Sequence, residues 1–507
     1  MRVSLAGDTN LSKNNHVLLL GHSPGDDSIA EQLRDLGYQV MREVQSSDGI
    51  REVLKKFATM GEWVHPGLSL WAGRADFWGW VADLGLTMIA PSPKVLSLFS
   101  NKLSLMMKAD ELGIPHLVMS FDPISSRREL EALIKKQAYP FVLKSAWGGR
   151  AGSRVRVIEK EQDLGEGFAL WLDQLRENCG EAIVFPERCL EAAKYITLPF
   201  ARYADDRIFF FPAVDASLQK NHRKVVEFCS VDLLSEEILE QLESEARKLL
   251  ESISYVGVGS LEFLIEGDVP YLIDARAGLD ENFKLWEKVA GTRAVEWQMS
   301  TLLSNQTPQA KNGKKMTHGL MIYIRSIDPF LDIPQPGKIR EQEASWKVQN
   351  PSPFMLDEVS FFARPGETIS YQSDGDVAHV WVFSSSRKTT LARASAILDA
   401  LWIAGTLKTN EQFIKDLIDH PWVREDMFHS RFVEEEFIPQ LVAPEDVQNL
   451  ALMVCRELVK DEGQRWWIGN KVLQIQKAEM KWKSQQSIIA ENAKRGVSGL
   501  VVYNGEI

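Results

Sequence analysis

The sequence predicts an α/β protein: a small doubly wound domain comes first, a longer mixed α/β region follows, and the tail is mostly helical. Two observations support this. Short apolar runs alternate with amphipathic helical patterns along most of the chain, which is typical of sheets covered by helices. The length of 507 residues, of which 45% are hydrophobic, corresponds to about three domain-sized units.

The first 100 residues follow the order strand, helix, strand. The run from His16 to Gly21 is almost entirely apolar, a helical pattern covers residues 26–36, and residues 39–43 are predicted as a second strand. Strands joined through a helix are typical of a doubly wound sheet. The turn at residues 21–25 lacks the GxGxxG pattern of dinucleotide-binding proteins, so it is predicted to be a plain strand-to-helix turn.

The central region is predicted from its periodicity and its glycines. Its predicted elements are a helix at 100–113, a strand at 139–144, a Gly-rich loop at 145–153, a returning strand at 154–159, a strongly amphipathic helix at 235–251, and strands at 256–265 and 270–274. Residues 305–317 are polar and are predicted as a linker or exposed loop. Residues 318–435 mix strands with one helix at 389–404, and the tail is predicted to be helical from about 444 to 491.

Composition excludes several classes of protein. The formal net charge of −12 argues against a nucleic-acid coat, which needs a basic surface. The four cysteines include no CxxC pair and are predicted to be free thiols in a reducing compartment. No signal-peptide core and no apolar run near 18 residues is present, so a cytoplasmic protein without a membrane span is expected.

One constellation indicates phosphate chemistry. Lys144 ends a predicted strand directly before a loop that contains Gly148 and Gly149. Glycines let backbone amides approach phosphate oxygens, and a lysine neutralises their charge. Glu262 and Asp274 lie twelve positions apart on neighbouring predicted strands, where they are candidate ligands for Mg²⁺. Taken singly, the loop also fits a flexible turn and the carboxylates fit solvated strand ends.

These residues belong to an ordered series of motifs that resembles the biotin carboxylase branch of the ATP-grasp superfamily, over about residues 15–435. The motifs are Val64-His65-Pro66-Gly67, Asn101-Lys102, the Gly-rich loop, Gln219 to Glu227, Gly257 to Leu264, Arg325, and Pro334 to Ile339. The resemblance implies an N-terminal doubly wound domain at 1–100, an ATP-grasp domain at 101–305 with its lid at about 116–190, and a biotin carboxylase C-terminal-like domain at 318–440. Residues 441–507 remain as a mostly helical tail and a candidate interaction segment.

The resemblance also implies roles for individual residues. The nucleotide contacts would be Lys102, Lys144, Gly148, Gly149, Glu187, Leu190, Gln219, His222 and Leu264. Glu262 and Asp274 would bind Mg²⁺ or Mn²⁺. Lys224 would face bicarbonate and the γ-phosphate, and Arg325 would stabilise negative charge on biotin or carboxyphosphate. For each lysine and arginine the competing interpretation is a surface ion pair.

The implied partners are ATP, bicarbonate and biotin borne on a carrier protein, with carboxyltransferase subunits and a homo- or hetero-oligomer also implied. The segment Lys477–Lys481 is superficially similar to a biotin-acceptor sequence. An acceptor lysine needs a tight hairpin, whereas this stretch is predicted to be helical and charged. Biotin is therefore predicted not to be attached to this chain.

The sequence departs from the family after Asp274. Gly278, Asp280 and Asn282 stand where the family has a bicarbonate-binding Arg, a Gln and the general-base Glu, and Arg276 stands for a metal-ligating Asn. An asparagine cannot take a proton from bicarbonate, and an aspartate repels the anion. Glu281 is the candidate replacement base, one position away.

Three functions fit these residues. The first is an ATP- and Mg²⁺-dependent ligase that carboxylates biotin on a carrier protein, with Lys224, Arg325 and Glu281 as catalytic residues. The second is a catalytically degenerate paralogue that binds nucleotide as a structural or regulatory subunit. The third is an ATP-grasp ligase that joins a carboxylate to an amine.

Overall fold

The computed structural model describes residues 15–43, 49–126, 128–130, 139–147, 155–160, 166–179, 182–308, 316–330, 332–344, 357–362, 365–369, 375–441, 465–468, 471–474, 490–492 and 497–499. They form a mixed α/β protein, which confirms the predicted fold class. The helices of the described part are too short or too polar to cross a membrane.

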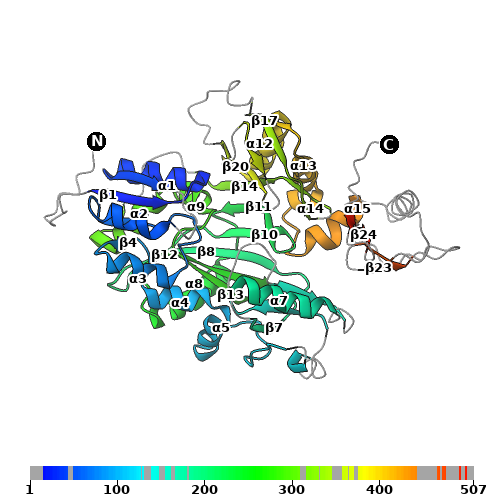
Figure 1. Ribbon diagram of the computed structural model, residues 1–507, viewed down its shortest axis with the longest axis horizontal. Helices are drawn as coiled ribbons and strands as arrows, with labels where there is room; N and C mark the ends of the chain where they lie inside the picture. The colour runs from blue at the N-terminus through cyan, green and yellow to red at the C-terminus, as the bar shows by residue number, and fades with distance from the viewer. Residues whose placement is uncertain are drawn as a thin grey trace.

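The N-terminal unit, drawn in blue in Figure 1, contains a four-stranded parallel sheet in the order β2-β1-β3-β4. Its strands and helices are β1 His16–Leu20, α1 Pro24–Asp35, β2 Gln39–Glu43, α2 Ile50–Phe57, β3 Trp63–His65, α3 Ala75–Asp83, β4 Thr87–Met88 and α4 Pro93–Ser100. Side chains of β1 alternate between two faces: Val17 and Leu19 pack in one core cluster with α1, whereas Leu18 and Leu20 pack in another with α2. Both faces are covered, which confirms the doubly wound prediction.

A second, three-stranded sheet has the order β6-β5-β7. Its elements are β5 Phe141–Ser145, β6 Val155–Ile158, α7 Glu166–Cys179 and β7 Val184–Arg188, and the preceding helix is α5 Lys102–Glu111. Phe141 and Leu143 share a buried cluster with the α7 residues Phe168, Trp171 and Leu172. The other face of β5 carries Val142 and Lys144, because side chains alternate along a strand.

The largest sheet is nine-stranded, with the order β13-β12-β8-β10-β11-β14-β20-β18 and β9 paired to β8. Its strands are β8 Lys194–Arg202, β9 Ile208–Phe210, β10 Val214–Lys220, β11 Arg223–Ser230, β12 Gly257–Glu266, β13 Val269–Ala277, β14 His318–Arg325, β18 Glu358–Phe361 and β20 Asp376–Ser384. The accompanying helices are α8 Glu236–Ser252, α9 Phe283–Ala290, α10 Ala294–Met299 and a π-helix at Ser300–Ser304. Strands from the predicted ATP-grasp and C-terminal units thus share one sheet.

The C-terminal unit adds two small sheets and several helices. These elements are β15 Ile327–Asp328, β16 Ile333–Pro334, β17 Gly337–Ala344, β19 Thr368–Ile369, α12 Arg387–Ala400, β21 Leu401–Gly405, α13 Glu411–Asp419, α14 Pro421–Arg424, a π-helix at Val433–Phe437 and α15 Ile438–Leu441. The helix predicted at 389–404 ends early, because Leu401 to Ala404 pair with β17.

Within the stretch of the tail predicted to be helical, residues 465–468, 471–474 and 490–491 lie in strands instead. β22 Arg465–Ile468, β23 Lys471–Gln474, β24 Ala490–Asn492 and β25 Val497–Gly499 form an antiparallel sheet. The run Trp466-Trp467-Ile468 consists of aromatic and β-branched residues, which favour strands over helices. The remaining tail, including Lys477–Lys481, lies outside the described residues.

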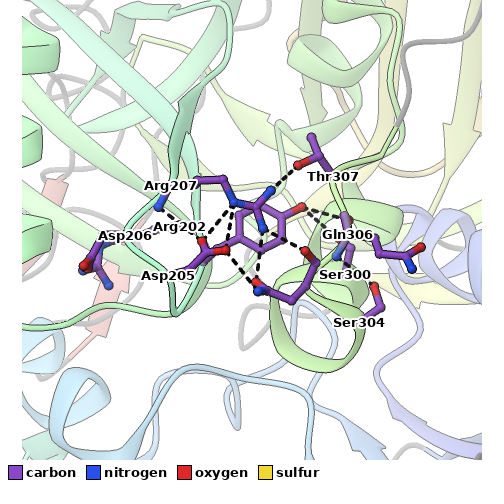
Figure 2. Close-up of polar contacts among 10 residues, drawn as sticks. Arg202, Asp205, Asp206, Arg207, Ser300, Ser304, Gln306 and Thr307 are labelled. Carbon is purple, nitrogen blue, oxygen red and sulfur yellow. Dashed lines mark hydrogen bonds and ion pairs between the residues drawn. The ribbon is translucent and has the colours of Figure 1, made fainter. Parts of the chain in front are cut away.

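The predicted linker at 305–317 is anchored at its start. Figure 2 shows Arg207, in the turn between β8 and β9, beside the end of the π-helix. Its guanidinium donates to the backbone carbonyl of Asn305 at 2.8 Å and to the hydroxyl of Thr307 at 2.5 Å. The Tyr203 hydroxyl lies 2.7 Å from Ser300 Oγ. The hairpin therefore fixes residues 305–307, and residues 309–315 lie outside the described part.

The motif Val64-His65-Pro66-Gly67 joins the N-terminal unit to the central one. The buried His65 ring accepts from Gly67 N–H at 2.9 Å, and its Nε2 lies 2.9 Å from Gln298 Oε1 on α10. Gly67 has φ +62°, and a Cβ there would meet the Leu20 carbonyl oxygen at 2.1 Å, so glycine is required. This motif is a structural joint between two units.

His65 provides a test of this joint. Burial lowers the pKa of His65 to about 4. This effect of burial is larger than the opposing effects of the Gln298 hydrogen bond and the Asp26 charge, which raise the pKa. Because the unfolded chain binds this proton near pH 6.5 and the folded chain does not, stability attributable to His65 falls as the pH drops from about 6.5 towards 4.

We expect the His65→Gln variant to lack that contribution. Between pH 7 and pH 4, the free energy of unfolding of the wild type should fall by on the order of 3 kcal/mol more than that of the variant. Urea unfolding at several pH values measures the difference. Parallel pH profiles for the two proteins would contradict it.

Candidate functional site

Lys102 and Lys144 are brought together by backbone contacts. Asn101 caps α5, because its side-chain oxygen accepts from Ser104 N–H at 2.9 Å. Lys102 N–H donates to the Ala146 carbonyl at 2.7 Å, and Asn101 forms a bridge with Trp147. The end of β5, which carries Lys144, is therefore tied to the start of α5, which carries Lys102.

Glu187 is the immediate partner of Lys144. The Lys144 Nζ lies 2.6 Å from Glu187 Oε2, and the two side chains are 12% and 3% exposed. Val142 is paired with Glu187 across β5 and β7, which places Lys144 and Glu187 on one face. The two predicted nucleotide contacts thus form a partly buried ion pair in the small sheet.

Leu190 and Leu264 meet in one apolar cluster. Leu190 is buried there with Leu117, Ala193 and Ile273, and Leu264 packs against the cluster from β12. The resemblance implied that both leucines contact the nucleotide, and the structure brings them together from distant parts of the chain. An apolar surface of this kind suits the face of an aromatic base.

His222 lies at the tip of the β10–β11 hairpin. Asn221 and His222 have φ values of +48° and +59°, as a two-residue hairpin turn requires, and Gln219 pairs with Lys224 at its base. The His222 side chain is exposed at this tip, yet the protein around it, followed by the charges of Lys144 and Lys102, lowers its pKa to about 4. The ring is therefore neutral at pH 7 and lies in the field of the two lysines that the sequence assigned to phosphate.

Glu262 and Asp274 face each other directly across β12 and β13. A register shift follows Glu262, and such bulges re-aim side chains. The prediction that these carboxylates lie together is confirmed by the register. Asp274 is in contact with the Lys102 ammonium. Although burial would raise the pKa of Asp274, Lys102 and Arg276 lower it below its ordinary value.

The oxygens of this pair already have donors. Glu262 Oε1 accepts from Arg276 Nε at 3.1 Å, and Oε2 accepts from the Tyr195 hydroxyl. Asp274 Oδ1 accepts from Ala275 N–H at 3.0 Å, and Oδ2 contacts Lys102. Mg²⁺ requires a near-octahedral shell of oxygen ligands, whereas a tyrosine hydroxyl and two cations occupy the positions around these carboxylates. This arrangement does not fit a divalent metal site.

Arg276 also links Glu262 to Asp280. The Oδ2 atom of Asp280 lies 3.6 Å from Arg276 Nε and 3.7 Å from Lys224 Nζ. Burial alone would raise the pKa of Asp280, but the charges of Arg276 and Lys224 lower it to about 2. Asp280 is thus a fixed negative charge at the position where bicarbonate was expected to bind.

Lys224 belongs to a buried network centred on Glu227. The Glu227 carboxylate, which is fully buried, lies 2.8 Å from Lys224 Nζ, accepts from the Asn282 amide at 3.0 Å and accepts from the Tyr323 hydroxyl. Burial would lower the pKa of Lys224, but Glu227 and then Asp280 raise it above its ordinary value. Lys224 is therefore a permanent cation held by two carboxylates.

Arg325 is held in place from several sides. Its Nε donates to Asp376 at 2.7 Å, its Nη1 donates to the Lys224 carbonyl at 2.5 Å, and its backbone N–H donates to Asn410 at 2.8 Å. Burial opposes the charge on Arg325, while Asp376 and also Glu281 raise its pKa. The structure thus brings Lys224, Arg325 and Glu281 into one neighbourhood.

The positions that depart from the family have definite environments. Asn282 is buried, and its amide is committed to Glu227. Gly278 has φ +91°, with open space where a Cβ would project. A side chain at Gly278 would have room but a strained backbone. Asn282 and Gly278 therefore carry neither an acidic nor a cationic side chain.

Two predicted nucleotide contacts, Gly148 and Gly149, lie outside the described residues.

Other residues of the site were not anticipated from the sequence. Glu227, Asp376 and Asn410 were not assigned as site residues, yet they position Lys224 and Arg325. A carboxylate inside the apolar run Val225-Val226-Glu227-Phe228 was the available signal, because such a group must be paired when buried.

The chain matches two family models. The ATP-binding domain of the carbamoyl-phosphate synthase L chain matches residues 101–306, and the biotin carboxylase C-terminal domain matches residues 330–435. Biotin carboxylase from Halalkalibacterium halodurans is 25% identical over 381 residues, which cover 74% of this chain and 81% of the relative. The chain is a biotin carboxylase-like ATP-grasp protein.

This biotin carboxylase-like protein is also similar to part of a longer carboxylase and to solved biotin carboxylase structures. Pyruvate carboxylase 1 from Caenorhabditis elegans is 25% identical over 395 residues, but the chain covers only 33% of its length. The biotin carboxylase domain dimer of Hydrogenobacter thermophilus 2-oxoglutarate carboxylase, solved with MgADP, ADP and bicarbonate, matches with a TM-score of 0.74 at 20% identity, covering 83% of this chain and 97% of that domain. The Campylobacter jejuni biotin carboxylase matches with a TM-score of 0.73 at 19% sequence identity, and the match covers 83% of this chain and 98% of that one. These structures share its fold.

Removing the central carboxylate tests the Glu227 network. The Glu227→Gln variant should lose about 3 kcal/mol of unfolding free energy, because it leaves a buried lysine without its nearest partner. Chemical denaturation measures the loss. The matched control is Glu52→Gln, which breaks an exposed pair with Lys55 and should cost less than about 1 kcal/mol. Equal losses in the two variants would refute a stabilising network.

Proposed function

We propose that the chain binds an adenine nucleotide as the biotin carboxylase-like component of a biotin-dependent carboxylase and does not itself carboxylate biotin. One observation carries the second half of this proposal: Asn282 stands in the general-base position and its buried amide donates to Glu227. An amide cannot accept the proton of bicarbonate. Asp280, with its pKa lowered to about 2, adds repulsion towards that anion.

Nucleotide binding is supported by the residues that match the nucleotide contacts of the family. Lys102 and Lys144 are tied together through backbone contacts, and both act on the neutral His222. Lys144 and Glu187 are paired, and Leu190 and Leu264 share an apolar cluster. Cations beside an apolar surface suit a phosphate chain with an attached base.

The proposed partners follow from the relatives. The biotin carboxylase domain of the Hydrogenobacter thermophilus enzyme is described as a dimer, and the chain covers a third of a pyruvate carboxylase. We propose that this chain assembles in the cytoplasm with subunits that carry biotin and the carboxyltransferase, or with an active biotin carboxylase copy.

A second candidate is an active carboxylase with Glu281 as the base. It is supported by the position of Glu281 directly after Asp280, whose Oδ2 lies 3.7 Å from Lys224 Nζ, because the backbone carbonyl of Lys224 accepts from Arg325. This role requires Glu281 to turn towards bicarbonate, one residue out of register with the family.

Turnover separates the two candidates. ADP release from Mg-ATP should show no increase on adding bicarbonate and biotin. If both substrates raise the rate, the proposal is wrong. Loss of that rate in Glu281→Gln would then support the second candidate.

Calorimetry with ADP tests the binding half. Lys144→Ala should weaken ADP binding by about tenfold or more, because it removes a cation from the phosphates. The control variant Lys94→Ala changes an exposed lysine on α4 and should bind as the wild type does. Equal affinities in the two variants would show that Lys144 does not contact the nucleotide.

A further inference from the structure

The guanidinium of Arg276 lies beside Glu262, one of the two carboxylates expected to hold a metal, and beside Asp280. Arg276 lies on β13, opposite Ser260 of β12 and two positions before Gly278. Its Nε is 3.1 Å from Glu262 and 3.6 Å from Asp280, while those carboxylates are only 1% and 14% exposed. The Arg276 side chain itself is 50% exposed, so it pairs with these largely buried carboxylates while remaining accessible to solvent.

Charge explains what this side chain does. The ion pairs in this part of the described structure join four carboxylates to three cations, namely Glu227, Glu262, Asp274 and Asp280 with Lys102, Lys224 and Arg276. Without Arg276 the set would carry two uncompensated negative charges, which a divalent ion would balance. With Arg276 only one remains, so the electrostatic gain from binding a divalent ion is smaller.

Arg276 also keeps donors for a ligand. Within the described part of the chain, its side-chain hydrogen bond to Glu262 uses Nε, so the two Nη groups keep their N–H donors. A guanidinium presents its N–H groups in a planar fork that matches phosphate oxygens in a bidentate way. One side chain can thus neutralise Glu262 on one edge and bind phosphate on the other, and these are the two tasks of a bridging metal ion.

We propose that Arg276 takes the place of the divalent cation, so that this chain binds the phosphates of a free nucleoside di- or triphosphate without Mg²⁺. This inference rests on the proposed nucleotide binding and specifies the form of the ligand. Lys102 and Lys144 complete the positive side, because backbone contacts tie the start of α5, which carries Lys102, to the end of β5, which carries Lys144. Lys102 is also the contact of Asp274, which removes the second carboxylate from metal binding.

The test compares ADP binding to the full chain in excess EDTA and in millimolar MgCl₂, by calorimetry. We expect the two dissociation constants to agree within about threefold. A wild type that binds ADP in MgCl₂ and at least tenfold more weakly in EDTA would overturn the inference while leaving nucleotide binding intact. No ADP binding in either condition would overturn both the proposed function and the inference.

Two variants sharpen the comparison. Arg276→Asn removes the guanidinium and supplies an oxygen, so ADP binding should weaken by about tenfold or more in EDTA and recover in MgCl₂. Arg424→Asn, which changes a mostly exposed arginine paired with Asp419, should behave as the wild type. If Arg276→Asn binds ADP in EDTA as tightly as the wild type, Arg276 is not the phosphate ligand.

A metal-only measurement is independent of the nucleotide. Mn²⁺ binding, followed by the electron paramagnetic resonance signal of the free ion, should be undetectable in the wild type at concentrations where Arg276→Asn binds one equivalent. A wild type that binds one Mn²⁺, with that binding unaffected by Arg276→Asn but lost in Glu262→Gln, would contradict the replacement of the metal by Arg276.

Discussion

The register between β12 and β13 is the constraint on which the site depends. It places Glu262 directly against Asp274 on a largely buried face, and two carboxylates cannot remain charged there without compensation. Lys102, Arg276 and Tyr195 provide that compensation from three different elements. The position of α5, the course of the chain after β13 and the residue chosen on β8 are all tied to that one pair.

Compensation within the protein changes what the fold is able to do. A site balanced by a metal ion is incomplete until the ion and nucleotide arrive, so its charge can be used in catalysis. Here Arg276 and Lys102 are part of the chain and cannot leave. The same logic applies to Glu227, whose three donors include the amide of Asn282. In both networks the buried carboxylates are paired with groups of the same chain.

Much of the fold could be predicted from local pattern. The strand at 39–43 and the helix at 235–251 agree with β2 and α8 within about one residue, because alternation and helical periodicity are local properties. Residues 401–404 could not be assigned correctly, since their strand exists only through pairing with β17. The boundaries proposed for the domains and their roles remain predictions.

The candidate site was predictable to a similar degree. The sequence placed Glu262 and Asp274 on neighbouring predicted strands, and in the structure the two residues are paired across β12 and β13. Their partners follow from long-range pairing: β8 runs antiparallel to β12 with Tyr195 opposite Leu264, one diagonal step from Glu262. No local pattern contains that information. Arg276 was visible as a change of residue type, whereas its contact with Asp280 depends on how the chain turns after β13.

The shared sheet has a consequence for how the protein is divided. β11 pairs with β14, and β14 with β20, so the sheet crosses from the residues matched by one family model to those matched by the other. Cutting the chain near residue 317 would leave β11 with a row of unpaired amides and carbonyls along a long apolar edge, and such edges recruit strands from other molecules. Two separate family models match these regions, but the regions share one continuous sheet in this protein.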